Sequence, residues 1–256
     1  MWKGTIRLGR VQIPVKLFSA ASDERVHFRL LHAPDQEPVE QRLLHPETEE
    51  SVERATTQLG YQVAAGTFVV LSQRELAELE PAESRDIEVL RFVPRGAIGP
   101  EWYVRPYYLG PDGDGESNSA LVQALSAEEE VGIVRWVMRK HAYVGALRSE
   151  GEHLSLATLR HSDEIIPARQ IAPEHSREPD AKERAMAEQL LGVFAGEFDP
   201  SAYHDEYRDR VQAFAEAKAR GKRPKLHKVE PHHPSEGSLA SVLAKSLERA
   251  RDQKVA

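Results

Sequence analysis

Three carboxylates, Asp112, Asp114 and Glu116, stand at alternating positions in the segment PDGDGES (residues 111–117). Oxygen ligands at such spacing suit Mg²⁺ or Ca²⁺, and a bound divalent metal would permit a nuclease reaction. The segment has a second explanation, because Pro-Asp-Gly is a typical turn sequence and the rest of a calcium-binding loop is missing. We interpret the segment as a turn and keep a metal-dependent nuclease as the alternative.

Other catalytic patterns are missing from the sequence. It has no glycine-rich phosphate loop, no zinc-protease helix motif, no nucleophile elbow and no cysteine that could act as a nucleophile or metal ligand. The pair His232–His233 could bind a metal, with a solvated linker as the alternative. We therefore predict a protein that is not an enzyme and that uses neither a cofactor nor a metal.

Basic residues form the other chemically suggestive group. The segment GRVQIPVKLFSA (residues 9–20) alternates apolar and polar positions, so a strand there would have one basic, polar face. Basic residues of a second segment, residues 135–161, could join it on one surface that attracts phosphate, or both could be ordinary solvated strand faces. The run AKARGKRPKLHK (residues 217–228) indicates either solubility or non-specific attraction of phosphate.

The formal net charge of the 256 residues is −7, but the charges are segregated along the chain. Residues 1–30 and 218–256 are net basic, whereas residues 31–130 and 178–217 are net acidic. Electrostatic potentials are screened over about 10 Å, so local charge governs binding more than net charge does. The acidic total therefore leaves a basic lining possible, and the composition does not decide the partner.

Short segments with strand-like patterns precede residue 171 and must position these side chains. Ser72 and Glu75 form a capping box that predicts a short helix over residues 72–79. A bend or bulge at Gly9 would reconcile the two halves of the opening strand. The apolar run at residues 131–148 also fits a helix, but its β-branched and aromatic residues favour two strands that bend near Lys140–His141. The other expected elements are strands at 26–32, 66–72 (buried), 86–93, 101–110 and 152–160, and a helix at 117–130. Many short strands between turns predict a barrel or a sandwich.

Helical periodicity takes over after residue 180. We expect a helix over residues 181–196 that ends at Gly196, and a second over residues 198–221 with Asp199 as N-cap and Pro200 in its first turn. A Pro-, His- and Lys-rich linker follows, and Ser238 caps a last amphipathic helix. The chain begins without an apolar leader, and its longest clean apolar run is FVVL, so we expect a soluble cytoplasmic protein.

Several segments resemble the bacterial Ku family in order and spacing. They are WKGTIRLGRVQIPVKLFSA, VHFRLLH, GYQVAAGTFVVLSQRELAEL, YVRPYYLGPDG, MRKHAYVGALR, LATLRHSDEI and AEQLLGVFAGEFDPSAYHDEY. The resemblance covers residues 2–220. It implies an α+β fold: a predominantly antiparallel, ring-forming β-barrel core (residues 1–172), a C-terminal helical arm (173–220) and a flexible tail with a terminal helix (221–256).

The resemblance also implies a function. Such a protein is a homodimer whose two barrels and connecting arms close into a ring around the ends of double-stranded DNA, associated with the nucleoid. It protects and bridges breaks and recruits the ATP-dependent DNA ligase of bacterial end joining, ligase D. A ring that accepts any break sequence needs phosphate contacts rather than contacts to base edges.

The candidate residues follow from this reading. Phosphate contacts on the core are Lys3, Arg7, Arg10, Lys16, Arg42, Arg135, Arg139, Lys140 and Arg160. The basic tail adds Lys218, Arg220, Lys222, Arg223 and Lys225, and the expected ligase-binding face is Leu239, Val242, Leu243 and Leu247. Many family members carry cysteines after the VHFRLLH segment, whereas this chain has an acidic stretch there, in the part that bridges over DNA in the family.

A protein scaffold that does not bind DNA is the remaining alternative.

Overall fold

The computed structural model describes residues 2–113, 115–168, 178–221 and 241–248. The chain divides into two compact units. The first comprises Met1–Glu24 and Phe28–Pro167, and the second comprises Arg25–His27 and Ala168–Ala256. No helix of the described residues is long and apolar enough to span a membrane.

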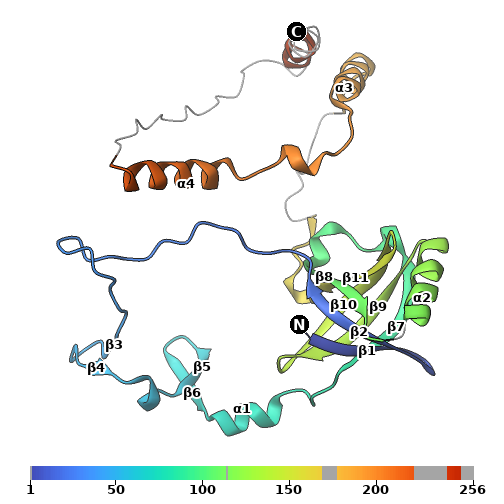
Figure 1. Ribbon diagram of the computed structural model, residues 1–256. Helices are drawn as coiled ribbons and strands as arrows, with labels where there is room; N and C mark the ends of the chain where they lie inside the picture. Colours follow the sequence, from blue (N-terminus) through green and yellow to red (C-terminus); the bar gives the residue numbers. More distant parts are fainter. Residues whose placement is uncertain (1, 114, 169–177, 222–240, 249–256) are drawn as a thin grey trace. The chain divides into compact units, whose positions relative to one another are not determined.

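A closed barrel of seven strands forms the compact part of the first unit (Figure 1). The strands are β1 (Trp2–Leu8), β2 (Val11–Ser19), β7 (Asp86–Pro94), β8 (Tyr103–Pro111), β9 (Glu130–Met138), β10 (His141–Glu150) and β11 (His153–Leu159). They pair in the order β1-β2-β8-β11-β10-β9-β7, and β7 closes the barrel by pairing with β1 in parallel. All other neighbours are antiparallel. The predicted α+β class with a predominantly antiparallel barrel is confirmed.

The barrel core follows the alternation of the sequence. In β2 the side chains of Ile13, Val15 and Leu17 are buried, while Lys16 between them is on the outer face. The strands β10 and β11 are buried on both faces. The helix α2 (Gly115–Ala127) packs against β9, β10 and β11, and its Leu121, Val122 and Leu125 join the buried cluster of barrel side chains. A strand covered on both faces loses the alternating pattern, which explains why residues 131–148 also fitted a helix.

The first two strands form a hairpin, where we had expected one strand bent at Gly9. Leu8 pairs with Val11, so Gly9 and Arg10 are the two turn residues. Gly9 has a φ of 58°, a conformation that glycine adopts without the steric cost of a side chain. The change of apolar parity at Gly9 therefore marks a chain reversal rather than a bulge.

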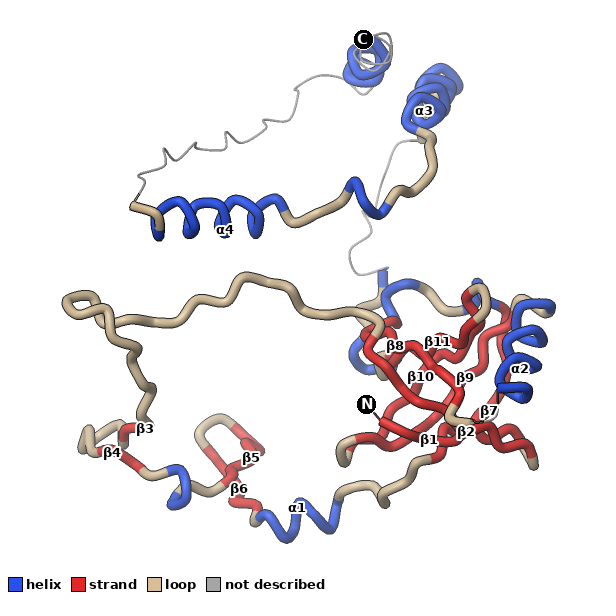
Figure 2. The backbone as a smooth tube through the Cα atoms, viewed as in Figure 1, coloured by secondary structure: helices blue, strands red, loops and turns tan. Residues whose placement is uncertain are grey.

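The segment between β2 and β7 leaves the barrel and contains two small hairpins and a helix (Figure 2). We call residues 20–85 the arm. Its elements are β3 (Leu43–Leu44), β4 (Ser51–Val52), η1 (Arg54–Thr56), β5 (Leu59–Ala64), β6 (Thr67–Leu71) and α1 (Gln73–Leu79). The capping box at α1 is confirmed, since Ser72 and Glu75 each accept a hydrogen bond from the other's backbone N–H.

Two predictions for the arm are wrong. Residues 26–32 form no strand and contribute only one bridge, between Leu31 and Pro38. The predicted strand at residues 66–72 exists as β6, but it is exposed rather than buried, and Phe68 is 61% exposed. An apolar run in a sequence indicates that a strand has apolar side chains, but it does not show whether another element of the unit packs against them. Nothing described in this unit buries β6.

The second unit is helical. It contains α3 (Ala181–Phe194), η6 (Pro200–Ala202), α4 (Glu206–Ala219) and helical residues 241–248. Asp199 caps only the short η6, and α4 begins later with Asp205 as its N-cap, so the predicted single helix is two elements. The helix α3 ends at Phe194 with Ala195 as its C-cap, and Gly196 has no capping role. Short 3₁₀ turns complete the first unit: η2 (Arg95–Ala97), η3 (Pro100–Trp102) and η4 (Ser162–Glu164).

Candidate nucleic-acid interface

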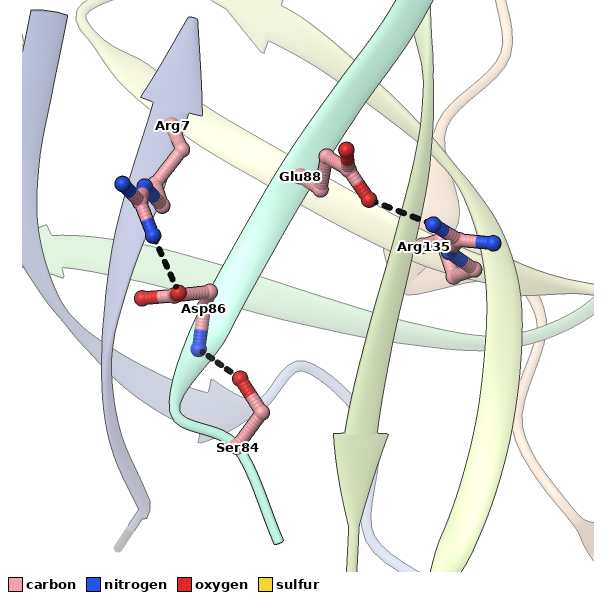
Figure 3. A network of polar contacts seen from close by, with 5 residues as sticks. All are labelled: Arg7, Ser84, Asp86, Glu88 and Arg135. Carbon is pink, nitrogen blue, oxygen red and sulfur yellow. Dashed lines mark hydrogen bonds and ion pairs between the residues drawn. The ribbon is translucent and has the colours of Figure 1, made fainter. Parts of the chain in front are cut away.

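A row of charged side chains crosses three neighbouring strands on the outside of the barrel. Arg7 of β1 contacts Asp86 of β7 at 2.8 Å, and Arg135 of β9 contacts Glu88 of β7 at 2.7 Å (Figure 3). The strand register places Glu88 directly opposite both Arg7 and Arg135. The Oγ of Ser84 accepts a hydrogen bond from the backbone N–H of Asp86 and fixes the start of β7. The row has two positive and two negative groups, so it is neutral.

These residues line a groove of about 940 Å³, which continues into a second groove of about 800 Å³. Both grooves are lined by Ser84 and Val137, which shows that they are contiguous. We call the first the charge-balanced groove and the second the basic groove. The basic groove is lined by the cations Lys3, Arg85, Arg139 and Lys140. Lysine and arginine side chains in a groove open to solvent can bind phosphate oxygens.

A second ion-pair cluster lies where β1, β2 and the end of β8 meet. Lys3 and Lys16 are directly opposite each other on β1 and β2, and the carboxylate of Asp112 accepts contacts from both at 2.9 Å. The hydrogen bond from Lys3, then that from Lys16, holds the pKa of Asp112 below its usual range. Asp112 thus offsets the repulsion between two ammonium groups that face each other across strands.

The contacts of Asp112 also bear on whether the acidic segment PDGDGES is a metal site or a turn. Asp112 is engaged by two lysines, Glu116 lies in the first turn of α2, and Asp114 is outside the described residues. Within the described part of the chain, no three acidic or histidine side chains form a group that could hold a metal ion. The turn interpretation fits this geometry: Gly113 has a φ of 109°. His232–His233 lies outside the described residues.

The turn between β9 and β10 carries Arg139 and Lys140 at its two central positions, as Met138 pairs with His141. The predicted bend near Lys140–His141 is therefore one residue earlier. Lys140 contacts Glu80, which follows α1, at 3.0 Å. Both turn residues are exposed at the rim of the basic groove.

The remaining core candidates are spread over the first unit. Arg10 is in the β1–β2 turn and Arg42 directly precedes β3 in the arm. Arg160 follows β11, where its Nε donates to the carbonyl of Glu101 at 3.1 Å. Of the nine predicted core cations, the two grooves bring together five: Lys3, Arg7, Arg135, Arg139 and Lys140.

The tail candidates are only partly within the described residues. Lys218 lies in the last turn of α4, and Arg220 contacts Glu216 at 3.6 Å. In the last helix Val242 and Leu243 are half-buried and Leu247 is buried. Four predicted residues lie outside the described part: Lys222, Arg223, Lys225 and Leu239.

Sequence reasoning missed Arg85 and the carboxylates that face the arginines. Arg85 precedes β7 in a segment without periodicity, so no pattern assigned it to a face. Asp86 and Glu88 flank the fully buried Ile87. Because Asp86 and Glu88 are two residues apart, they lie on the same face of the strand, and this spacing could have predicted an acidic outer face on β7.

The chain matches the family model described as the Ku70/Ku80 beta-barrel domain over residues 7–190. It is 33% identical over 250 residues to "Non-homologous end joining protein Ku 2" of Geotalea uraniireducens, covering 97% of each chain. It is 32% identical over 255 residues to "Non-homologous end joining protein Ku" of Koribacter versatilis, covering 99% of this chain and 87% of the relative. A similar protein from Heliobacterium modesticaldum is 32% identical over 223 residues, 86% of this chain and 81% of its own. The chain therefore belongs to the Ku family of non-homologous end-joining proteins, DNA-repair factors that are not enzymes.

Proposed function

We propose that this protein binds the ends of double-stranded DNA as a homodimeric ring, protects and bridges breaks, and recruits a DNA ligase, ligase D, during end joining. The observation that carries the proposal is the pair of contiguous grooves on the barrel, which gather five of the predicted phosphate contacts. Phosphate contacts suit this role because breaks occur in any sequence, whereas contacts to base edges would restrict binding.

Exposed apolar side chains support the homodimer. The arm and the helical unit expose large apolar groups that monomeric proteins ordinarily cover. In the arm these are Phe28, Leu30, Leu43, Leu44, Leu59, Tyr61, Val63, Phe68 and Val70, and in the helical unit Leu191, Phe194, Phe198, Tyr203 and Tyr207. A second copy of the chain would supply the cover, and an acidic outer shell would disfavour DNA that wraps around the outside of the ring.

The proposed domain roles follow the chain. Residues 1–172 would hold DNA, residues 173–220 would join the subunits, and the tail (residues 221–256) would add non-specific attraction and contact the ligase. Val242 and Leu243 keep part of their surface accessible for such a contact. Deletion of residues 221–256 should leave DNA loading intact and abolish stimulation of ligation.

The test compares one plasmid as a closed circle and as a linear duplex, in a gel-shift assay with excess competitor. A ring must be threaded from an end, so binding should be confined to the linear form and should persist when the ends are blocked after loading. Equal binding to circle and linear duplex would refute the threaded ring, and no binding to either at physiological salt would favour a DNA-independent scaffold.

A further inference from the structure

The basic groove collects cations from three segments that are far apart in the sequence. Lys3 comes from β1, Arg85 precedes β7, and Arg139 and Lys140 form the β9–β10 turn. The parallel pairing of β1 with β7 and the antiparallel pairing of β7 with β9 bring these segments to one end of the barrel. The groove of about 800 Å³ is thus a built feature of barrel closure.

Within the described residues, two of its four cations have acidic partners and two do not. Lys3 contacts Asp112 at 2.9 Å and Lys140 contacts Glu80 at 3.0 Å. Glu83 also lines the groove, but no acidic side chain in the described part of the chain forms an ion pair with Arg85 or Arg139. Among the described residues, these two guanidinium groups therefore have no acidic partner, and each has a donor geometry that matches phosphate oxygens.

The turn that supplies Arg139 and Lys140 has an unfavourable backbone. Their φ angles are 50° and 67°, so both residues are in the left-handed region. Two-residue turns of this kind prefer Asn-Gly, because other L-residues meet a steric cost there. Strain of this kind is retained where the residues serve a function that a relaxed turn would not provide.

We propose that the basic groove is a phosphate-binding site for a DNA strand, in which Arg85 and the Arg139–Lys140 turn are the principal contacts. The turn gives up stability to place two cations at the rim. This inference rests on the proposed function and deepens it, since it names the part of the barrel that holds the strand and adds a contact, Arg85.

The decisive variant replaces the turn by its preferred residues, Arg139→Asn with Lys140→Gly. Because this variant removes both the strain and the two charges, its unfolding temperature should rise by about 2–8 °C while its affinity for linear duplex falls about tenfold or more. The slope of log affinity against log salt should become shallower by about one for each phosphate that the variant no longer binds. A more stable protein with unchanged affinity and slope would overturn the inference.

Arg85 is tested separately with Arg85→Gln, which keeps length and removes the charge. The affinity should fall about three- to tenfold and the salt slope should become shallower by about one, whereas Arg85→Lys should keep the slope. The matched control is Arg91→Gln, an exposed arginine of the adjoining strand β7 that does not line either groove. An equal effect of Arg85→Gln and Arg91→Gln would refute a specific groove.

Two duplex substrates distinguish the source of the phosphate. If the variants lose affinity only for ends that carry a 5′-phosphate, the groove binds a terminal phosphate; if they lose affinity equally for 5′-hydroxyl ends, it binds the internal backbone. Both results support the site, and no loss on either substrate contradicts it. Wild-type binding confined to linear duplex, with no loss in the variants, would leave the proposed function standing and remove only this inference.

Discussion

Gly145 is the position where a single methyl group should perturb the barrel most clearly. It lies in β10, two residues beyond Tyr143, whose ring stacks on Trp136 of β9 at 5.3 Å between centroids. A Cβ at Gly145 would lie 2.6 Å from the carbonyl oxygen of Ala157 and 2.6 Å from the ring of Trp136. Ordinary contacts of this kind are 3.4–4 Å, so either β11 or the ring must move.

Neither neighbour can move easily. Trp136 is 1% exposed and fully enclosed by the core, and the Ala157 carbonyl belongs to a strand paired on both sides. Inserting a methyl group into such a site costs about 1–3 kcal/mol, and the clash with both backbone and ring places Gly145→Ala near about 3 kcal/mol. For a chain of this size that corresponds to a fall of roughly 6–12 °C in unfolding temperature.

The assay is urea unfolding followed by tryptophan fluorescence, with thermal unfolding as a second measurement. Gly110→Ala is the matched control, because this strand glycine of β8 would place its Cβ 3.4 Å from Phe18 and near nothing else. Trp136→Phe removes the ring atoms that would collide, so the double variant should recover part of the loss, with a coupling of about 1 kcal/mol or more. A loss below about 0.5 kcal/mol for Gly145→Ala, or no coupling with Trp136→Phe, would refute the packing argument.

Three further outcomes are expected. Asp112→Asn should remove part of the acid sensitivity of unfolding. Hydrogen bonds from Lys3 and Lys16 lower the pKa of Asp112 in the folded state, so its contribution to stability is complete above the unfolded-chain value near 3.8 and is lost as pH falls through the lower folded value. A series of urea midpoints from pH 6 to 2 measures this loss. Asp86→Asn with Glu88→Gln should raise the affinity for duplex several-fold, because the charge-balanced groove becomes more positive by two charges. The loss of each exposed ion pair should cost less than about 1 kcal/mol of stability. Fluorescence anisotropy measures the affinity and thermal unfolding the stability, and an unchanged or lower affinity would contradict the prediction. Ser72→Ala should destabilise α1 locally by about 1 kcal/mol and speed amide exchange there, with barrel exchange unchanged.

The sequence predicts the barrel strands best where only one face is buried. Ile13, Val15 and Leu17 mark the inner face of β2, and the tight turns at Gly9 and Gly151 separate neighbouring strands. Strand pairing is a different matter: β1 pairs with β7 across the whole arm, and no local pattern reports such a partner. The exposed strand β6 shows the same limit, because an apolar face is visible in a sequence while its cover is not.

The candidate site likewise has features that the sequence shows and features that only the three-dimensional structure shows. Lys3, Arg7 and Arg135 lie on the exposed faces of their strands, each next to at least one buried residue. Parity cannot report that Asp86 and Glu88 stand next to those arginines, because this follows from three-dimensional register. Arg85 has no periodic context at all. Cations can therefore be predicted one at a time, whereas their partners and their common groove require the fold.

The parallel closure of the barrel across the arm has a consequence for synthesis. The β1–β2 hairpin is complete early, but its neighbours β7 and β8 follow only after the arm, roughly 70 residues later for β7. At ~5–20 residues per second, the nascent hairpin has two unpaired edges for about 3–14 s, and such edges are templates for aggregation. Charged side chains and proline at an edge oppose such pairing, and the hairpin carries Arg7, Arg10, Pro14 and Lys16. The same basic residues that we propose to bind DNA would thus also protect the unfinished chain from aggregation during synthesis.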